Sequence, residues 1–502
     1  MPCSLERARM AINMAIKVKK MKTIKKAITS ILLSTMICAV PMFTSCGGNE
    51  DNGKIKLYMD GGGGSGNYNT TRSYNTLEAL AKEWNAKNDT YEIVINTVSL
   101  NGNRSSITSM LEAGTAPDLL MQVGNVVNDD IGNGWYVDLG SYLEKPNPYE
   151  AGNTAWSDIY GTSALAAAKA SDGKNYYVCL DTIALGMMYN MDILNAAGVT
   201  EAPSTYSELM DCFEKLKAAK DAGTITADIY LPSGHWYENY LGTSVFANKI
   251  AELDEDGTNM VSSYELVKGY YDGKWSIDDA QFREFLQLCS DKAEYYPENY
   301  LGYDVPFKFA RGNLAVTDAV GNMMVTIAKN AKFDLEITGY PVLDEEASAY
   351  GGATVVRGSA GLSSAYWVTN SAINKGQGAV DACVDFLMYL TASDNNSRLV
   401  NDLGYAMPLN VDKSNVALFS GLKEQYKQDK ANANTLLWSA CHIPGLLGTS
   451  FDDVYQLAMG DLYQDSDGVL TGNVQAVVDK LQAQLPNSIA ALMSKYGWTF
   501  GE

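Results

Sequence analysis

Four segments decide the fold of this chain: 54–59 (KIKLYM), 77–84 (LEALAKEW), 91–95 (YEIVI) and 118–121 (DLLM). The first and third alternate polar and apolar residues as strands do, and the last is a short apolar run typical of a buried strand. Apolar residues of the second segment recur at helical spacing: Leu77, Leu80, Ala81 and Trp84. A second helical pattern at 107–111 precedes the last strand. A strand–helix–strand–helix–strand order predicts parallel strands joined by crossover helices, hence an α/β fold.

Length and charge bound the function. A chain of 502 residues predicts two or three domains. The formal net charge is −21, and the first 45 residues are basic, so the remainder is more acidic still. Such a surface repels nucleic acid and anionic membranes, and it disfavours a polyanionic ligand. One anionic group held in a local basic pocket stays open.

Residues 21–46 indicate export. Lys22, Lys25 and Lys26 form a positive start, and the apolar stretch 27–40 is too short to span a bilayer. Small residues directly before Cys46 resemble a lipobox, which predicts a signal peptide at 21–45 and a diacylated, palmitate-bearing Cys46. The alternative is an ordinary secretory signal in which Cys46 is incidental. Either signal places the folded part outside the cytoplasm.

The segments on either side of this signal are not expected to belong to the folded domains. Residues 1–20 precede a complete signal that starts at Met21, so we interpret them as an over-called start. Residues 46–53 are polar and predict a flexible tether. Later apolar runs are too short to span a membrane, so the lipid would be the sole anchor. Five further cysteines, an odd number without metal-site spacing, are expected to be free and mostly buried: Cys179, Cys212, Cys289, Cys383 and Cys441.

Five motifs resemble family 1 extracellular solute-binding proteins of ABC importers, the class of the maltose-binding protein. The helix-to-strand signature Ala-Gly-x-x-Pro-Asp lies at 113–118. A longer match combines Gly-Lys-x-Tyr, Tyr-Asn-x-Asp and Pro-x-Thr-Tyr-x-Glu-Leu within 172–216. The remaining matches lie at 309–316, 379–391 and 403–408, so the resemblance covers essentially all of 54–502. Capping explains several of these residues: Thr205 with Glu208 forms a capping box, Gly114 ends a helix, and Asn190 and Asp192 are expected to fix turns.

The resemblance implies a two-lobed, type II-like periplasmic-binding-protein fold, each lobe a mostly parallel sheet flanked by helices. We expect a first lobe of 54–182 and 318–370 and a second lobe of 183–317 and 371–502. A hinge would be crossed near 180–185, 317–318 and 368–372. The implied protein is a monomer without catalytic activity, cofactor or metal, which binds a carbohydrate and delivers it to the membrane subunits of an ABC permease.

Candidate ligand contacts follow from the expected topology, because loops at the carboxyl ends of parallel strands face each other across such a cleft. The first lobe would offer polar side chains after its strands: Asn67, Gln122 and Asn125. Relatives of the maltose-binding protein place a carboxylate where this chain has Asp181. The resemblance adds Asp318 and Asn322, although relatives often carry a tryptophan near the latter.

Sugar chemistry adds aromatic candidates, because a pyranose ring packs its C–H face on an aromatic side chain. Clusters of such residues supply four of them: Trp236, Tyr237, Trp367 and Trp438. Core packing is the alternative for each. Arg357 is either a cleft donor or, as we prefer, a solvated charge at a strand end.

Other chemistries fit the chain less well. The glycine run 61–66 lacks the Gly-Lys-Ser/Thr of a phosphate loop. Residues 252–257 and 465–468 are similar to half of a calcium loop but lack its terminal glutamate, so we interpret them as turns. Only two histidines are present, which argues against a zinc site or a serine triad. We therefore predict a lipid-anchored binding protein for a carbohydrate, in particular an oligosaccharide. The alternatives are a non-sugar or modified-glycan solute and, from another class, a surface glycan-degrading enzyme.

Overall fold

The computed structural model describes residues 53–61, 71–96, 104–122, 130–160, 165, 168–170, 172–298, 300–431, 435–437, 439–463 and 469–500. The expected signal peptide, Cys46, the tether, Asn67, Asn125 and Trp438 lie outside these residues. Residues Ile55–Glu502 form one unit of contacts, and the account below concerns that unit. Among the described residues, no helix has the length and apolar character that crossing a membrane requires.

The predicted opening strands are confirmed. β1 (Ile55–Asp60) pairs in parallel with β2 (Tyr91–Asn96) and with β3 (Leu119–Gln122). Helices α2 (Thr71–Asn85) and α3 (Arg104–Ala113) connect them. The predicted apolar face of α2 is buried, and Trp84 donates its indole N–H to Asp385 at 2.8 Å.

Two long strands carry the sheet onward. β4 (Tyr177–Asn190) and β8 (Ser359–Val368) pair antiparallel with each other, and β3 pairs antiparallel with β8. The strand order is β2-β1-β3-β8-β4-β6-β5, with β5 (Asp228–Tyr230), β6 (Leu314–Val320), and β7 (Leu335–Thr338) bound to β4 off this path. β5 and β6 are parallel, whereas β4 runs against β6 and β7. The sheet is therefore mixed rather than mostly parallel.

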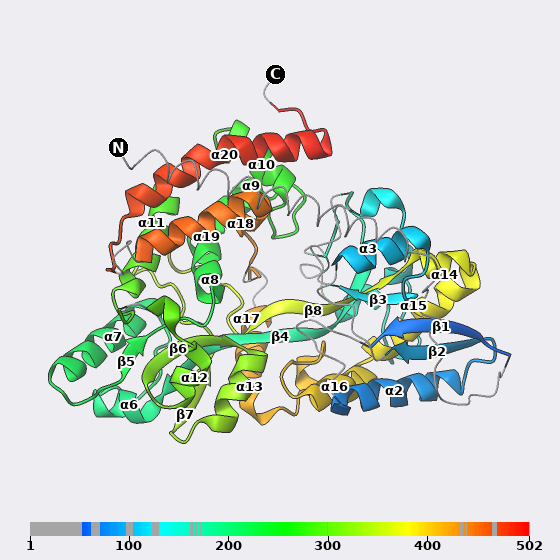
Figure 1. Ribbon diagram of the computed structural model, residues 1–502, viewed down its shortest axis with the longest axis horizontal. Helices are drawn as coiled ribbons and strands as arrows, with labels where there is room; N and C mark the ends of the chain where they lie inside the picture. The colour runs from blue at the N-terminus through cyan, green and yellow to red at the C-terminus, as the bar shows by residue number, and fades with distance from the viewer. Residues whose placement is uncertain are drawn as a thin grey trace, which may run out of the picture. The chain divides into compact units, whose positions relative to one another are not determined.

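Two large hydrophobic cores divide the structure into lobes; β4 runs through both, and β8 enters the first from its pairing with β4 at the boundary (Figure 1). Val178 and Leu180 of β4 belong to the core built on β1, whereas Ala184 and Tyr189 of the same strand belong to the core built on β5 and β6. We call the half with β1 the first lobe and the half with β5 the second lobe. The two-lobed α/β prediction is confirmed.

The lobe boundaries differ from the expected ones. The first core includes Ala379, Phe386 and Leu399, so α14 (Asn370–Asn374), α15 (Gln377–Thr391) and α16 (Ser393–Leu403) cover the first lobe, although 371–502 was expected in the second. β6 and α13 (Gly321–Asn330) pack in the second core, although 318–370 was expected in the first. The reason is burial: α15 is apolar on nearly all sides and needs cover from both α2 and the sheet.

The chain crosses between the cores at three places. β4 crosses near 180–184 and β8 near 359–362. The third crossing follows α16, where Thr182 and Met407 exchange backbone hydrogen bonds of 2.8 and 2.9 Å. The expected crossing at 180–185 is confirmed. Those at 317–318 and 368–372 are wrong, because the first lies inside β6 and the second inside the first lobe.

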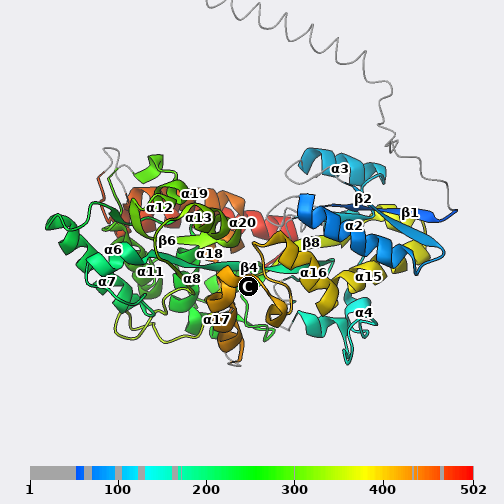
Figure 2. The same ribbon diagram turned by 90° about the horizontal axis from the view of Figure 1, so that it is seen from below.

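Helices cover both lobes (Figure 2). The first lobe also has α4 (Gly140–Leu143). The second lobe carries α6 (Met191–Ala196), α7 (Tyr206–Asp221), α8 (Trp236–Val245), α9 (Ala247–Leu253), α10 (Ser263–Tyr271), α11 (Ala280–Ala293), α12 (Val305–Ala310), α17 (Ser420–Ala431), α18 (Ile443–Leu446), α19 (Thr449–Tyr463) and α20 (Val474–Tyr496). The predicted capping box of Thr205 and Glu208 opens α7, and Asn190 caps α6.

Candidate binding site between the lobes

The parallel strands of both lobes end at the junction. Along β3 the partner in β8 changes from Val368, opposite Leu119, to Ala365, opposite Gln122, which is the direction of the crossing. Along β6 the partner in β4 changes toward Leu185, opposite Val320, again toward the crossing. The segments that follow β3, β5 and β6 therefore converge on the line where the lobes meet. This is the arrangement in which α/β proteins place their ligands.

Buried acidic side chains lie where β4 crosses between the lobes. Asp181 of β4 is 1% exposed, and its Oδ2 accepts a 2.7 Å hydrogen bond from Ser364 Oγ of β8. Ser364 has a positive φ of 50°, a strained backbone conformation for a residue with a side chain. Asp60, at the end of β1, is also buried. Burial raises the pKa of Tyr366, and the charges of Asp60 and Asp181 raise it further. Carboxylates from two different strands therefore lie close enough to act on the same tyrosine.

Gln122 lies in a polar cluster at the end of β3. Its Oε1 accepts from Arg104 at 3.1 Å, and its amide N–H donates to the Tyr136 hydroxyl at 2.9 Å. Arg104 forms an ion pair with Asp130, which also accepts from Tyr136 at 3.1 Å. Burial raises the pKa of Tyr136, and the charge of Asp130 raises it further. The first lobe thus presents a cation and an amide that are held in place at the junction.

The second lobe contributes the turn 233–237, which joins β5 to α8. Asp318 of β6 is fully buried and accepts backbone N–H groups from Ser233 at 2.9 Å and Tyr237 at 3.4 Å. Burial raises the pKa of Asp318 to about 6. The Asp318 carboxylate therefore holds both ends of the turn through these backbone N–H groups, instead of contacting a ligand.

In this turn His235 is exposed, and Trp236 is partly buried against the core of the second lobe. A Cβ atom at Gly234 would lie 2.7 Å from the Trp236 ring, so the ring covers the turn and only glycine fits beneath it. His235 is half exposed, and its Nδ1 lies 2.8 Å from Glu238 Oε2. The hydrogen bond to Glu238 raises the pKa of His235 against the opposing effect of burial. The turn offers a partly exposed indole and an exposed imidazole.

The other expected contacts fare differently. Tyr237 is buried and its hydroxyl donates to the Pro341 carbonyl. Trp367 is 1% exposed and packs on Tyr136 and Tyr177 at centroid distances of 5.0 and 4.4 Å. Neither is a platform in this conformation, because both side chains are almost completely buried. Asn322 is exposed at the start of α13, beside the crossing.

Sequence reasoning missed three partners in these clusters: Arg104, Asp130 and Ser364. Each is brought to the junction by long-range packing and carries no local motif. Arg357 also differs from the expected solvated charge. Its Nε lies 3.6 Å from Asp429 of α17, and both side chains are mostly buried.

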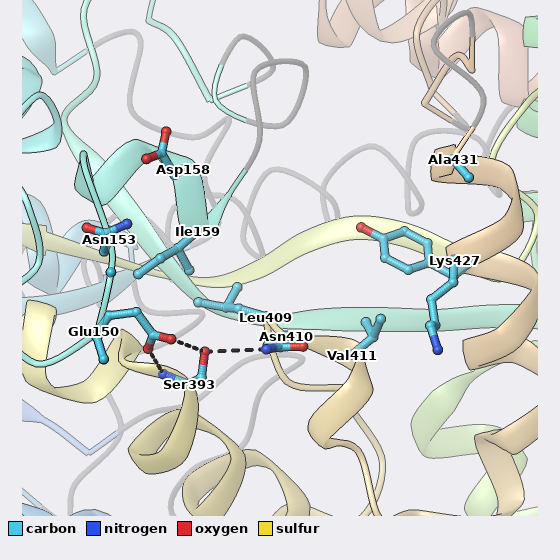
Figure 3. A pocket seen from close by; sticks show the side chains of 13 residues that line it. Glu150, Asn153, Asp158, Ile159, Ser393, Leu409, Asn410, Val411, Lys427 and Ala431 are labelled. Atoms are coloured by element: carbon cyan, nitrogen blue, oxygen red, sulfur yellow. Dashed lines mark hydrogen bonds between the residues drawn. The ribbon is translucent and has the colours of Figure 1, made fainter.

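A groove of about 600 Å³ also spans the two lobes (Figure 3). Glu150 and Asn153 line it from the first lobe, and Lys427 of α17 lines it from the second. Its polar groups are already engaged: Glu150 accepts from Ser393 Oγ at 2.9 Å, and Lys427 pairs with Asp412 at 2.6 Å. Any change in the angle between the lobes would alter the width of this groove.

Three acidic side chains meet on the second lobe, where the sequence predicted a turn. Carboxylate oxygens of Asp254, Asp256 and Glu265 lie within 4.8 Å of one another, a spacing that could hold a cation. Backbone N–H groups already donate to Asp254 and Glu265: Asn259 at 2.7 Å and Glu255 at 2.7 Å. The cluster closes its own loop, as the predicted turn required.

Two lobes, three crossings and polar strand ends that converge between them are typical of a solute-binding protein. Comparison with family models supports this assignment: the model of the bacterial extracellular solute-binding proteins matches residues 79–434. The chain belongs to this family, and the predicted resemblance is confirmed.

Individual relatives are distant. The chain is 24% identical over 286 residues to the diacetylchitobiose binding protein DasA of Streptomyces coelicolor, and the match spans 55% of this chain and 60% of that protein. Among solved structures, the cyclic alpha-maltosyl-1,6-maltose binding protein of Arthrobacter globiformis is similar with a TM-score of 0.58 and 15% identity, over 87% of this chain and 100% of that one. A chitin oligosaccharide binding protein gives a TM-score of 0.56 and 17% identity, over 87% and 99%. At these identities the structures show the fold alone.

Proposed function

We propose that the protein captures an oligosaccharide between its lobes outside the cytoplasm and delivers it to the membrane subunits of an ABC importer. The observation that carries this proposal is the convergence of buried carboxylates, a held cation and a partly exposed indole where the two lobes meet. Asp60 and Asp181 supply acceptors for sugar hydroxyls, Arg104 supplies a donor, and Trp236 supplies a ring for a pyranose face. The names of the distant relatives, which bind chitin- and maltose-derived sugars, favour the same ligand class.

Closure would complete the site. Contacts from Asp181, Trp236 and Asn322 come from the crossing and the second lobe, whereas Gln122 and Arg104 come from the first. A ligand that touches both sets binds the closed arrangement better, and therefore shifts the population toward it. A lipid on Cys46 would keep the protein beside its importer, with no other membrane contact and no need for a second copy of the chain.

A thermal-shift screen tests the ligand class, with diacetylchitobiose, longer chitin oligosaccharides and cyclic maltosyl-maltose as probes. A ligand bound only by the native protein stabilises it by about 2.7 kcal/mol at a hundredfold excess over Kd, so we expect a rise of several degrees with one glycan series. Recovery of that glycan intact would agree with capture without turnover. No shift with any saccharide would move the proposal to a non-sugar or modified-glycan solute.

Asp181→Asn tests whether the buried Asp181 carboxylate contributes to solute binding. Asparagine keeps an oxygen for Ser364 but removes the charge, so we expect at least tenfold weaker saccharide binding, about 1.4 kcal/mol, with little loss of melting temperature. Asp192→Asn on α6 is the matched control, because that exposed carboxylate lies far along the second lobe from the crossing. Equal affinity of both variants would remove Asp181 from the site.

A further inference from the structure

Lys292 is a fully buried cation in the second lobe. It lies on α11 with 0% exposure, and its Nζ is 3.9 Å from Glu238 Oε1. Among the described residues its Nζ has no hydrogen-bond partner. Instead it faces aromatic rings, with centroids at 5.5 Å for Tyr230, 5.7 Å for Tyr237 and 6.0 Å for Tyr296. A buried ammonium is costly, and an apolar side chain of similar length would avoid that cost.

The carboxylates that face Lys292 both hold the turn 233–237. Glu238 is buried and accepts from His235 at 2.8 Å and from the Tyr463 hydroxyl of α19. Asp318 accepts the backbone N–H groups at the two ends of the turn. The charge of Lys292 lowers the pKa of both carboxyl groups against the raising effect of burial. The charge of Lys292 therefore acts on both of the carboxylates that hold the turn 233–237.

The surrounding elements offer no second cation for this purpose. The groups that face the cluster are His235 and Glu238 of α8, Asp318 of β6, Cys289 of α11, Tyr230 of β5, Tyr296 and Tyr300 after α11, and Tyr455 and Tyr463 of α19. Among these described groups only His235 can carry a positive charge, and its Nδ1 is already bound to Glu238. Without Lys292, two buried carboxylates would share one half-exposed imidazole.

We propose that Lys292 is a positioning residue of the solute site: its buried ammonium offsets the charges of Glu238 and Asp318, which hold His235 and Trp236 at the junction of the lobes. The inference rests on the proposed function only in that this turn contacts the solute. Lys292 touches no solute itself and acts through the two carboxylates.

The test compares Lys292→Met with Lys292→Arg in the otherwise unchanged protein. We expect Lys292→Met to weaken binding of the saccharide that shifts the wild-type melting temperature by about tenfold or more, and Lys292→Arg to restore part of the affinity. Lys220→Met is the matched control, because that lysine pairs with Asp228 at 2.6 Å on the surface of the same lobe. Wild-type affinity in Lys292→Met would overturn the inference, whereas a wild-type protein that binds no saccharide would overturn the proposed function instead.

A second readout separates positioning from plain loss of structure. The chain has only two histidines, so NMR resolves the titrations of His235 and His442. Because the Lys292 charge opposes protonation of His235, its removal should move the titration midpoint of the His235–Glu238 pair upward. An unchanged midpoint would contradict the inference. If Lys292→Met does not fold, Glu238→Gln with Lys292 intact should weaken saccharide binding, and unchanged affinity there would overturn the inference equally.

Discussion

Replacing Asp318 by asparagine should change how the stability of the protein depends on pH. Asp318 is fully buried, and burial raises its pKa from the ordinary value of 3.8 to about 6. The folded protein therefore holds this proton more tightly than the unfolded chain does. A group of this kind contributes stability that is fully present below pH 3.8 and is lost as pH rises through about 6.

The magnitude follows from the displacement of the pKa. A shift of about two units corresponds to about 3 kcal/mol between the two protonation states. Asparagine keeps an oxygen for the Ser233 N–H and cannot ionise, so the variant escapes this loss. Most of this change falls between pH 4 and pH 7, where we expect the free energy of unfolding of Asp318→Asn, relative to wild type, to rise by about 2.4 kcal/mol.

Urea unfolding at several pH values measures this difference, because titrating groups outside the Asp318 cluster are common to both proteins and cancel. The m-values should agree, which confirms that both unfold to the same extent. A difference in unfolding free energy that stays constant from pH 4 to pH 7 would refute the reasoning. A fall in this difference from pH 4 to pH 7 would mean that the charge of Lys292 outweighs burial and lowers the pKa of Asp318.

Three further substitutions test the frame of the site. Gly321→Ala would place a Cβ atom 2.1 Å from the Tyr405 carbonyl oxygen of the third crossing, so we expect a loss of about 1–3 kcal/mol in urea unfolding and a changed lobe-to-lobe distance in spin-label measurements; an unchanged distance would show that the crossing absorbs the shift. Thr205→Ala removes the cap of α7 and should cost about 1 kcal/mol in thermal unfolding, whereas Thr205→Ser should be neutral. Asp118→Ala removes the acceptor of the Tyr58 N–H and of Lys375 Nζ, which lies at 2.7 Å; we expect about 3 kcal/mol of destabilisation in urea unfolding, and a loss below about 1 kcal/mol would mean that the ion pair behaves as a solvated one.

Local chemistry was readable from the sequence. The capping box at Thr205, the cap at Asn190 and the glycine end of α3 at Gly114 depend on residues a few positions apart, and all three are confirmed. The apolar face of α2 was equally readable, because helical spacing fixes which residues share a side. These features need no knowledge of the rest of the chain.

Long-range packing was not readable. The lobe that receives α15 is decided by contacts such as that between Trp84 and Asp385, 301 residues apart. Lys292 lies on an amphipathic helix, where a lysine is expected at the surface, and only the neighbouring tyrosines and Glu238 account for its burial. Trp367 was misjudged for the same reason, since alternation along β8 cannot tell that both faces of the strand are covered.

The five cysteines between residues 179 and 441 are all buried and free. Burial raises the pKa of each thiol, to about 12 for Cys212 and Cys441, so little thiolate exists near neutral pH and reagents cannot reach it. A cysteine introduced on the surface of each lobe would therefore be the reactive one, in protein produced without its first 52 residues. Two dyes attached there would turn the movement of the lobes into a colour change, and the protein into a fluorescent reporter of its own solute with no native cysteine removed.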